Sequence, residues 1–124
     1  SFIGSPPMNL LQGRLADDGG SFTLANADAI KLPFIHNAIA GHDCIMGLRP
    51  EQLIFGQPGL TMRAELVEAL GADLLVHASI GDQLLVMRVP AATAVEAGQK
   101  ITAGFDPAAL HWFNSQTTQR IELG

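Results

Sequence analysis

Glycine and proline interrupt this chain at short intervals, and this feature constrains its fold more than any other. The 124 residues include 13 Gly and 7 Pro, which are scattered along the chain rather than clustered. Glycine tolerates positive φ and proline lacks a backbone N–H, so both residues tend to end helices and strands. Frequent breaks of this kind are typical of short strands joined by turns. We therefore expect a β-rich domain.

Alternating side chains and turn residues locate the strands of the first half. We expect strands at residues 8–15, 21–24, 29–32 and 42–48, turns at 16–20 and 26–28, and a loop with at most one helical turn at 33–41. The first turn reads Ala-Asp-Asp-Gly-Gly, and its Asp and Gly residues suit turn conformations. Pro50 favours an extended conformation at Arg49, so the last of these strands should stop there.

The second half starts at a candidate linker, Gly-Gln-Pro-Gly-Leu at residues 56–60, which divides the chain into halves 1–57 and 58–124. After it we expect strands at 82–90 and 99–105, with turns at 81–82 and 97–98.

Residues 62–75 give a conflicting signal. Strong helix formers, Leu66 and Leu70 four residues apart, and a following Gly71 favour a helix. A strand through the same residues needs a bulge after Leu66, because Met62, Ala64 and Leu66 share one face and Val67 and Ala69 share the other.

Charge and cysteine content exclude several classes of partner. The net charge is −5, and the seven basic residues are spread singly along the chain. Nucleic acids and anionic membrane surfaces need a clustered basic face, so we expect neither as a partner. The single cysteine, Cys44, cannot form an internal disulfide and should be a buried, reduced thiol, which fits a reducing compartment. The chain starts without Met and reads as a cytoplasmic fragment of a larger protein.

Sequence signals for catalysis are weak. Lys31 follows Ile30 and Lys100 follows Gln99, so neither lysine lies in a phosphate-binding Gly-rich loop. No Gly-x-Ser-x-Gly nucleophile motif occurs. The histidines lack the close spacing typical of zinc ligands; they are His36, His42, His77 and His111. We therefore expect no enzymatic activity, metal or cofactor in this chain.

Several motifs, in order, resemble one family. They are Phe-Ile-Gly-Ser-Pro-Pro-Met-Asn at 2–9, Gly-Leu-Arg-Pro-Glu-Gln-Leu at 47–53, Val-Glu-Ala-Leu-Gly-Ala-Asp at 67–73, and the stretch from 95 through Gly-Phe-Asp-Pro at 104–107 to Leu-His-Trp-Phe at 110–113. This order is similar to the regulatory domains of the ATP-binding subunits of maltose- and glycerol-phosphate-type ABC importers. The resemblance implies an all-β fold of two small OB-like (TOBE-type) barrels from one continuous segment, with at most short helical turns. It also implies that residues 63–70 form a bulged strand.

The resemblance carries functional expectations. Residues 1–124 would be a single regulatory domain fragment, whose ATPase domain, with its ATP and Mg²⁺, lies upstream. The domain would pair with a second copy, stabilise the ATPase homodimer and receive a regulatory protein or small effector. The absent domain would contact the membrane permease subunits, which would place the protein in the cytoplasm, peripheral on the inner membrane.

The motif residues fall into structural and interface candidates. We expect a structural role, fixing where the chain enters the domain and holding a loop through an Arg–carboxylate pair, for Ser5, Pro6, Met8, Asn9, Arg49, Pro50 and Glu51. Candidate interface or regulatory positions are Gly98, Gly104, His111, Trp112 and Phe113. Adjacent aromatic residues in a strand point to opposite faces, so Trp112 or Phe113 should face outward, unless a twist places both in the core.

An alternative function is oxyanion binding, as in the related barrels of molybdate-type systems. The resemblance to such a barrel implies that Ser5 and Asn9 are at the positions of anion ligands. However, Pro6 and Pro7 remove backbone N–H groups that an oxyanion needs.

Overall fold

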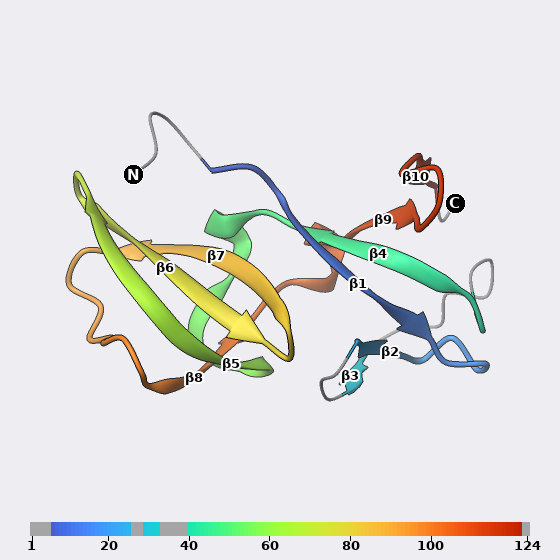
Figure 1. The fold of residues 1–124 in the computed structure, drawn as a ribbon, viewed down its shortest axis with the longest axis horizontal. Helices are drawn as coiled ribbons and strands as arrows, with labels where there is room; N and C mark the ends of the chain where they lie inside the picture. Colours follow the sequence, from blue (N-terminus) through green and yellow to red (C-terminus); the bar gives the residue numbers. More distant parts are fainter. Residues whose placement is uncertain (1–5, 26–28, 33–39, 123–124) are drawn as a thin grey trace.

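The structure is a computed structural model that describes residues 6–25, 29–32 and 40–122. Its strands are β1 (Asn9–Leu15), β2 (Ser21–Leu24), β3 (Ala29–Lys31), β4 (Asp43–Leu48), β5 (Ile54–Leu70), β6 (Asp73–Ile80), β7 (Gln83–Pro90), β8 (Lys100–Gly104), β9 (His111–Asn114) and β10 (Arg120–Ile121). Two short 3₁₀ turns, η2 (Pro50–Gln52) and η3 (Pro107–Ala109), lie between strands (Figure 1). The all-β prediction is confirmed. In the described residues no helix has the length and apolar character to cross a bilayer.

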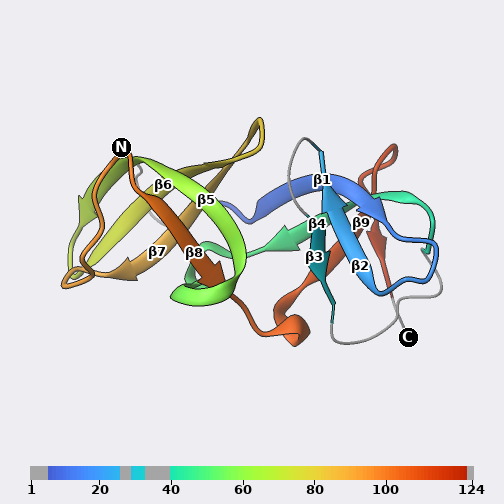
Figure 2. The same cartoon turned by 90° about the horizontal axis from the view of Figure 1, so that it is seen from below.

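The strands form two antiparallel sheets. The first sheet has the order β10-β9-β4-β1-β2-β3, and the second has the order β7-β6-β5-β8. Figures 1 and 2 show them side by side, with the second sheet on the left. The chain leaves the first sheet after β4, builds the second from β5 to β8, and returns to pair β9 with β4. The first sheet therefore contains strands from both halves of the chain, and no single boundary at residue 57 separates the two sheets.

The linker prediction at 56–60 is wrong, because these residues lie inside β5. Gly56 and Gly59 have positive φ, and both Phe55 and Leu60 align with Ala103 of β8. The Gly and Pro residues thus accommodate an irregularity within a long strand, where their turn-forming conformations suit a bulge as well as a linker.

The conflict over residues 62–75 is resolved in favour of strands. Ala64 pairs with Ala78 and Leu66 with His77, so Glu65 is the extra residue of a bulge and the strand at 63–70 is bulged as predicted. The bulge comes before Leu66, not after it, which leaves Leu66 52% exposed while Ala64 is buried. Pairing with β6 on one side and β8 on the other overrides the helical propensity of this segment.

One hydrophobic core joins the inner faces of both sheets. It takes residues from the first sheet, such as Phe22 and Met46, and from the second, such as Met62 and Met87. The strands expected at 8–15, 21–24, 29–32, 42–48, 82–90 and 99–105 correspond to β1, β2, β3, β4, β7 and β8. β6 and β10 were not predicted, and the turn expected at 26–28 lies outside the described residues, as does most of the loop expected at 33–41.

Candidate functional site

The outward face of the first sheet carries apolar side chains that the core does not use. Alternation along β1, β4 and β9 puts Leu11, Met46 and Trp112 in the core, so their neighbours Leu10, Ile45 and Phe113 face outward. Leu10 is 54% exposed and Phe113 is half-buried. We call Met8, Leu10, Ile45 and Phe113 the outer apolar cluster. An outward apolar surface of this kind is typical of a protein contact.

Gly47 keeps this face flat. It pairs with Leu10 on one side and with His111 on the other. A Cβ atom at residue 47 would lie 2.6 Å from Sδ of Met8 and 2.7 Å from Cε2 of Phe113. The missing side chain therefore lets Met8 and Phe113 close over the centre of the sheet, which explains a glycine at the start of the Gly-Leu-Arg-Pro-Glu motif.

Charged groups border the cluster at the β9–β10 end. Nη2 of Arg120 donates to Nδ1 of His111, and Arg120 also forms an ion pair with Glu122, with Nε and Oε1 3.4 Å apart. Partial burial lowers the pKa of His111, and the positive charges of Arg120 and Arg49 lower it further, against an opposing effect of Glu122. His111 therefore favours the neutral form, in which Nδ1 accepts the hydrogen bond from Arg120.

Trp112 lies in the hydrophobic core rather than on the surface. Only 3% of its surface is exposed, and its ring meets that of Phe22 edge to face with centroids 5.3 Å apart. The expectation that one of the two adjacent aromatic residues faces outward is confirmed, and that residue is Phe113. Of the predicted His-Trp-Phe cluster, His111 and Phe113 remain candidate contact residues.

The Arg-Pro-Glu motif is held differently from the prediction. The ion pairs formed by described residues do not include one between Arg49 and Glu51. Instead, Gln52 fixes the 3₁₀ turn, because its N–H donates to the carbonyl of Arg49 and its Oε1 accepts from the N–H of Arg49. Pro50 is buried at the first position of the turn, where its missing N–H costs nothing.

The residues expected to fix the start of the domain are only partly described. Ser5 lies outside the described residues, Pro6 is buried, and Met8 belongs to the outer apolar cluster. Asn9 is buried and forms two hydrogen bonds with the backbone of Val86 on β7. Its carboxamide thus has a structural role, which leaves the oxyanion alternative without its expected amide ligand.

The two candidate glycines occupy positions where the backbone matters. Gly98 has a φ of 91° in the turn before β8, and its carbonyl accepts a hydrogen bond from Nη1 of Arg63 at 2.7 Å. Gly104 packs against the irregular part of β5, where a Cβ would lie 2.8 Å from the carbonyl oxygen of Pro58. The turn expected at 97–98 is therefore confirmed, and Gly104 lies opposite the irregular part of β5.

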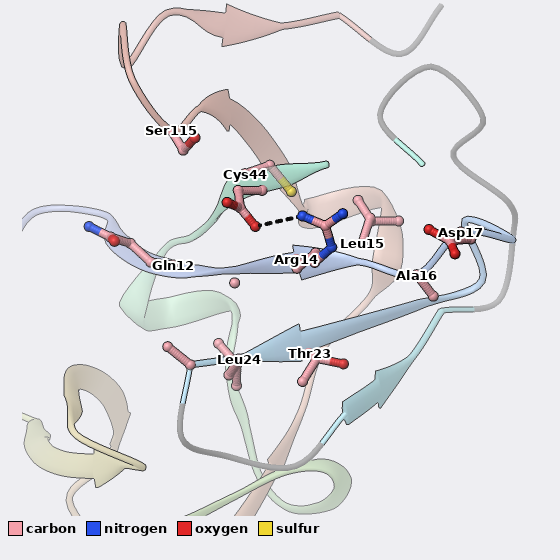
Figure 3. A pocket seen from close by; sticks show the side chains of 12 residues that line it. Gln12, Arg14, Leu15, Ala16, Asp17, Thr23, Leu24, Cys44 and Ser115 are labelled. Carbon is pink, nitrogen blue, oxygen red and sulfur yellow. Dashed lines mark hydrogen bonds and ion pairs between the residues drawn. The ribbon is translucent and has the colours of Figure 1, made fainter. Parts of the chain in front are cut away.

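A cavity of about 980 Å³, lined by described residues, follows β1. Figure 3 shows Arg14 on β1 among the lining residues, and its Nη1 lies 3.2 Å from Oδ1 of Asp43; Leu15 and Asp17 also line the cavity. Two carboxylates and one guanidinium give this lining a net negative charge, which disfavours an anionic ligand.

Cys44, one of the residues that line this cavity, is a free thiol that is 1% exposed. Burial raises its pKa to about 11, although the backbone N–H of Leu15 opposes the shift. The thiol is therefore buried, as predicted, and the raised pKa favours its protonated form. His36 lies outside the described residues, and the remaining described residues include no group of three or more potential metal ligands.

Sequence reasoning missed three residues that matter here. Leu10 could have been found, because Leu10 and Leu11 are adjacent in a strand and must face opposite sides. Gln12 and Gln83 have no local sequence signal, yet their contact joins the two sheets.

Comparisons with known proteins agree with this architecture. A family model described as "MalK OB fold domain" matches residues 4–53, and one described as "TOBE domain" matches residues 46–113. The chain is 37% identical to the sn-glycerol-3-phosphate import ATP-binding protein UgpC of Bordetella pertussis, over 98% of this chain and 35% of that protein. It is 39% identical to the protein of the same name from Burkholderia lata, over 96% of this chain and 35% of the relative. The chain spans about a third of the length of these relatives.

Proposed function

The chain belongs to the TOBE domain family, and we propose that it acts as the regulatory and dimerisation domain of the ATP-binding subunit of a sugar-type ABC importer. The observation that carries this proposal is the match of nearly the whole chain to proteins named as ATP-binding import subunits. Because the match covers 35% of those relatives, ATP and Mg²⁺ would belong to the rest of such a subunit. This domain would bind neither and catalyse no reaction.

The rest of the subunit sets the other expected partners. An ATPase domain would contact membrane permease subunits, so the protein would lie on the cytoplasmic side of the inner membrane without spanning it. The relatives' names indicate a small solute such as sn-glycerol 3-phosphate as the transported substrate. A regulatory protein or a small effector would act by favouring one arrangement of the ATPase dimer over another.

The outer apolar cluster is the surface best suited to a second copy of the chain. Leu10 and Phe113 project from the regular face of the first sheet, which can meet its copy about a two-fold axis. Arg120 and Glu122 place both signs of charge beside the cluster, so two copies can pair opposite charges at the rim. Burial of the exposed Leu10 and the half-buried Phe113 would provide the attraction at the centre.

Sedimentation equilibrium of the wild-type chain over a wide concentration range tests this function. The proposal predicts a reversible monomer–dimer equilibrium, weak because the ATPase domains are absent. A monomer at every concentration would contradict the dimerisation part. Calorimetric titration with molybdate, sulfate and phosphate tests the oxyanion alternative, for which saturable heat at low ligand concentration would be required.

A further inference from the structure

Two side-chain carboxamides join the sheets between β1 and β7, which share no backbone ladder. Nδ2 of Asn9 donates to the carbonyl of Val86 at 2.8 Å, and the N–H of Val86 donates to Oδ1 of Asn9 at 2.7 Å. Nε2 of Gln83 donates to the carbonyl of Gln12 at 2.8 Å, and the N–H of Gln12 donates to Oε1 of Gln83 at 2.7 Å. We call these two pairs of hydrogen bonds the amide clasps.

The clasps are reciprocal. Asn9 lies on β1 and binds the backbone of β7, whereas Gln83 lies on β7 and binds the backbone of β1. A carboxamide presents a donor and an acceptor side by side, as a peptide group does, so each side chain takes the place of a residue in a neighbouring strand. The clasps thereby satisfy backbone groups of β7, an edge strand of the second sheet, and of β1.

The two clasps differ in their contact with solvent. Asn9 is 8% exposed and is the one buried polar side chain in the described part of the chain. Loss of its carboxamide would leave the N–H and C=O of Val86 without these partners in a partly buried setting, which is costly. Gln83 is half-buried beside the exposed Gln12, so water can replace its hydrogen bonds when that clasp opens.

We infer that the amide clasps hold the two sheets at one fixed angle. The buried hydrogen bonds of Asn9 are the permanent connection, and the hydrogen bonds of Gln83 can break and be replaced by water. The shared hydrophobic core supplies attraction between the sheets but little directionality, because apolar contact is not directional. Paired hydrogen bonds at two points along β1 fix both the position and the direction of β7 relative to β1.

The connection of the two sheets through the amide clasps, which we call the coupling, has a consequence for signalling. This consequence rests on the proposed function. β1 begins at Asn9, the last residue of the motif at 2–9, where the resemblance places the entry of the chain into this domain. A displacement of residues 6–8 would reach the first sheet through β1 and the second sheet through Asn9. Both sheets would then follow the ATPase domain as one body.

The distance between the sheets, measured with paired spin labels in the isolated chain, tests the coupling directly. Cysteines introduced at Glu96 and Gln116, both exposed, place one label beside each sheet, while buried Cys44 stays unlabelled. The wild-type clasps predict a single narrow distance distribution. N9A/Q83A should broaden or shift it, and Q83A alone should do so to a smaller extent.

Gln12→Ala is the matched control, because both of the clasp hydrogen bonds at this residue use its backbone and survive removal of its side chain. Hydrogen exchange reports the clasps locally: the Val86 amide should exchange about tenfold faster in N9A, and the Gln12 amide in Q83A. Circular dichroism and Trp112 emission establish that each variant is folded. If N9A does not fold, Q83A and Q12A still provide the comparison.

An unchanged distance distribution in folded variants with open clasps would overturn the inference, as would a broad distribution in the wild type. Neither result would bear on self-association, which the sedimentation experiment measures separately. Conversely, a strictly monomeric chain with a narrow, clasp-dependent distribution would support the coupling and contradict the dimer.

Discussion

The rings of Phe22 and Trp112 meet edge to face, with centroids 5.3 Å apart and planes inclined by 74°. Phe22 lies on β2 and Trp112 on β9, and β1 and β4 separate these strands in the first sheet. In a flat sheet three strand spacings would hold the two backbones roughly 14 Å apart. The contact therefore shows that the first sheet curls around its core, as an OB-like barrel requires.

Replacing Phe22 by Leu removes this ring contact but keeps Trp112 as a fluorescent probe. We expect the free energy of unfolding to fall by about 1–2 kcal/mol, because a fully buried ring is replaced by a smaller side chain. Urea unfolding followed by Trp112 emission measures the loss. Phe113→Leu, the same change at a half-buried position outside the core, should cost less; equal costs would contradict the assignment of the two faces.

Gly13 should not tolerate alanine. A Cβ at this position would lie 2.4 Å from the carbonyl oxygen of Thr23 and 2.6 Å from Cζ of Phe22. Because one of these neighbours is backbone, β1 and β2 must separate, and we expect a loss of about 1–3 kcal/mol in urea unfolding. Gly20→Ala is the control, since its nearest neighbour is the Asp18 side chain at an ordinary 3.4 Å. A stable Gly13→Ala variant would show that the two strands are less closely packed.

Stability should depend on pH through His111. Its folded pKa lies below the ordinary value of 6.5, because partial burial, Arg120 and Arg49 disfavour the charged ring. The unfolded state therefore takes up a proton at a higher pH than the folded state does. The contribution of His111 to the free energy of unfolding is present at pH values above its ordinary pKa. It is lost as the pH falls through 6.5 towards the folded pKa.

Urea unfolding of wild type and His111→Gln at several values between about pH 5 and pH 8 isolates this effect. The wild type should lose more stability than the variant on acidification. Parallel pH profiles for the two proteins would argue against the lowered pKa.

Cys44 should resist thiol reagents in the folded state. Its pKa is raised from 9.0 to about 11 by burial, and only the thiolate reacts. At a pH below both pKa values, a pKa difference of about two units corresponds to about 100-fold less thiolate than in an ordinary cysteine. Steric protection of the buried sulfur would slow the reaction further. A disulfide reagent applied with and without denaturant measures the ratio of rates, and similar rates in both states would show that the pocket opens readily.

The local sequence pattern was sufficient to predict those strands in which apolar and polar side chains alternate and whose ends carry Gly, Asp or Pro. It failed between residues 54 and 80, where β5 contains two irregularities and the sequence favours a helix. Here the pairing of β5 with both β6 and β8 decides the structure, and pairing is a long-range property. Alternation showed that a strand at 63–70 would need a bulge, but only the family resemblance favoured a strand there over a helix.

The same limit applies to the candidate site. Alternation in β9 correctly indicated that His-Trp-Phe has an outward residue, although it could not choose between Trp112 and Phe113. The contact of Asn9 with Val86 joins residues 77 positions apart, and no local pattern carries that information. An ion pair between Arg49 and Glu51 was expected from charge alone. In the structure the side chain of Gln52 fixes this turn instead, through a hydrogen bond with the backbone of Arg49.

The most direct test of the regulatory and dimerisation account is sedimentation equilibrium of Leu10→Ser/Phe113→Ser beside Leu84→Ser. Leu84 is 75% exposed on β7, so its replacement removes exposed apolar surface from the second sheet instead of the outer apolar cluster. We predict that the wild type and Leu84→Ser dimerise alike, and that the double variant stays folded and monomeric. Dimerisation that persists unchanged in the double variant, or a wild type that never associates, would contradict the account.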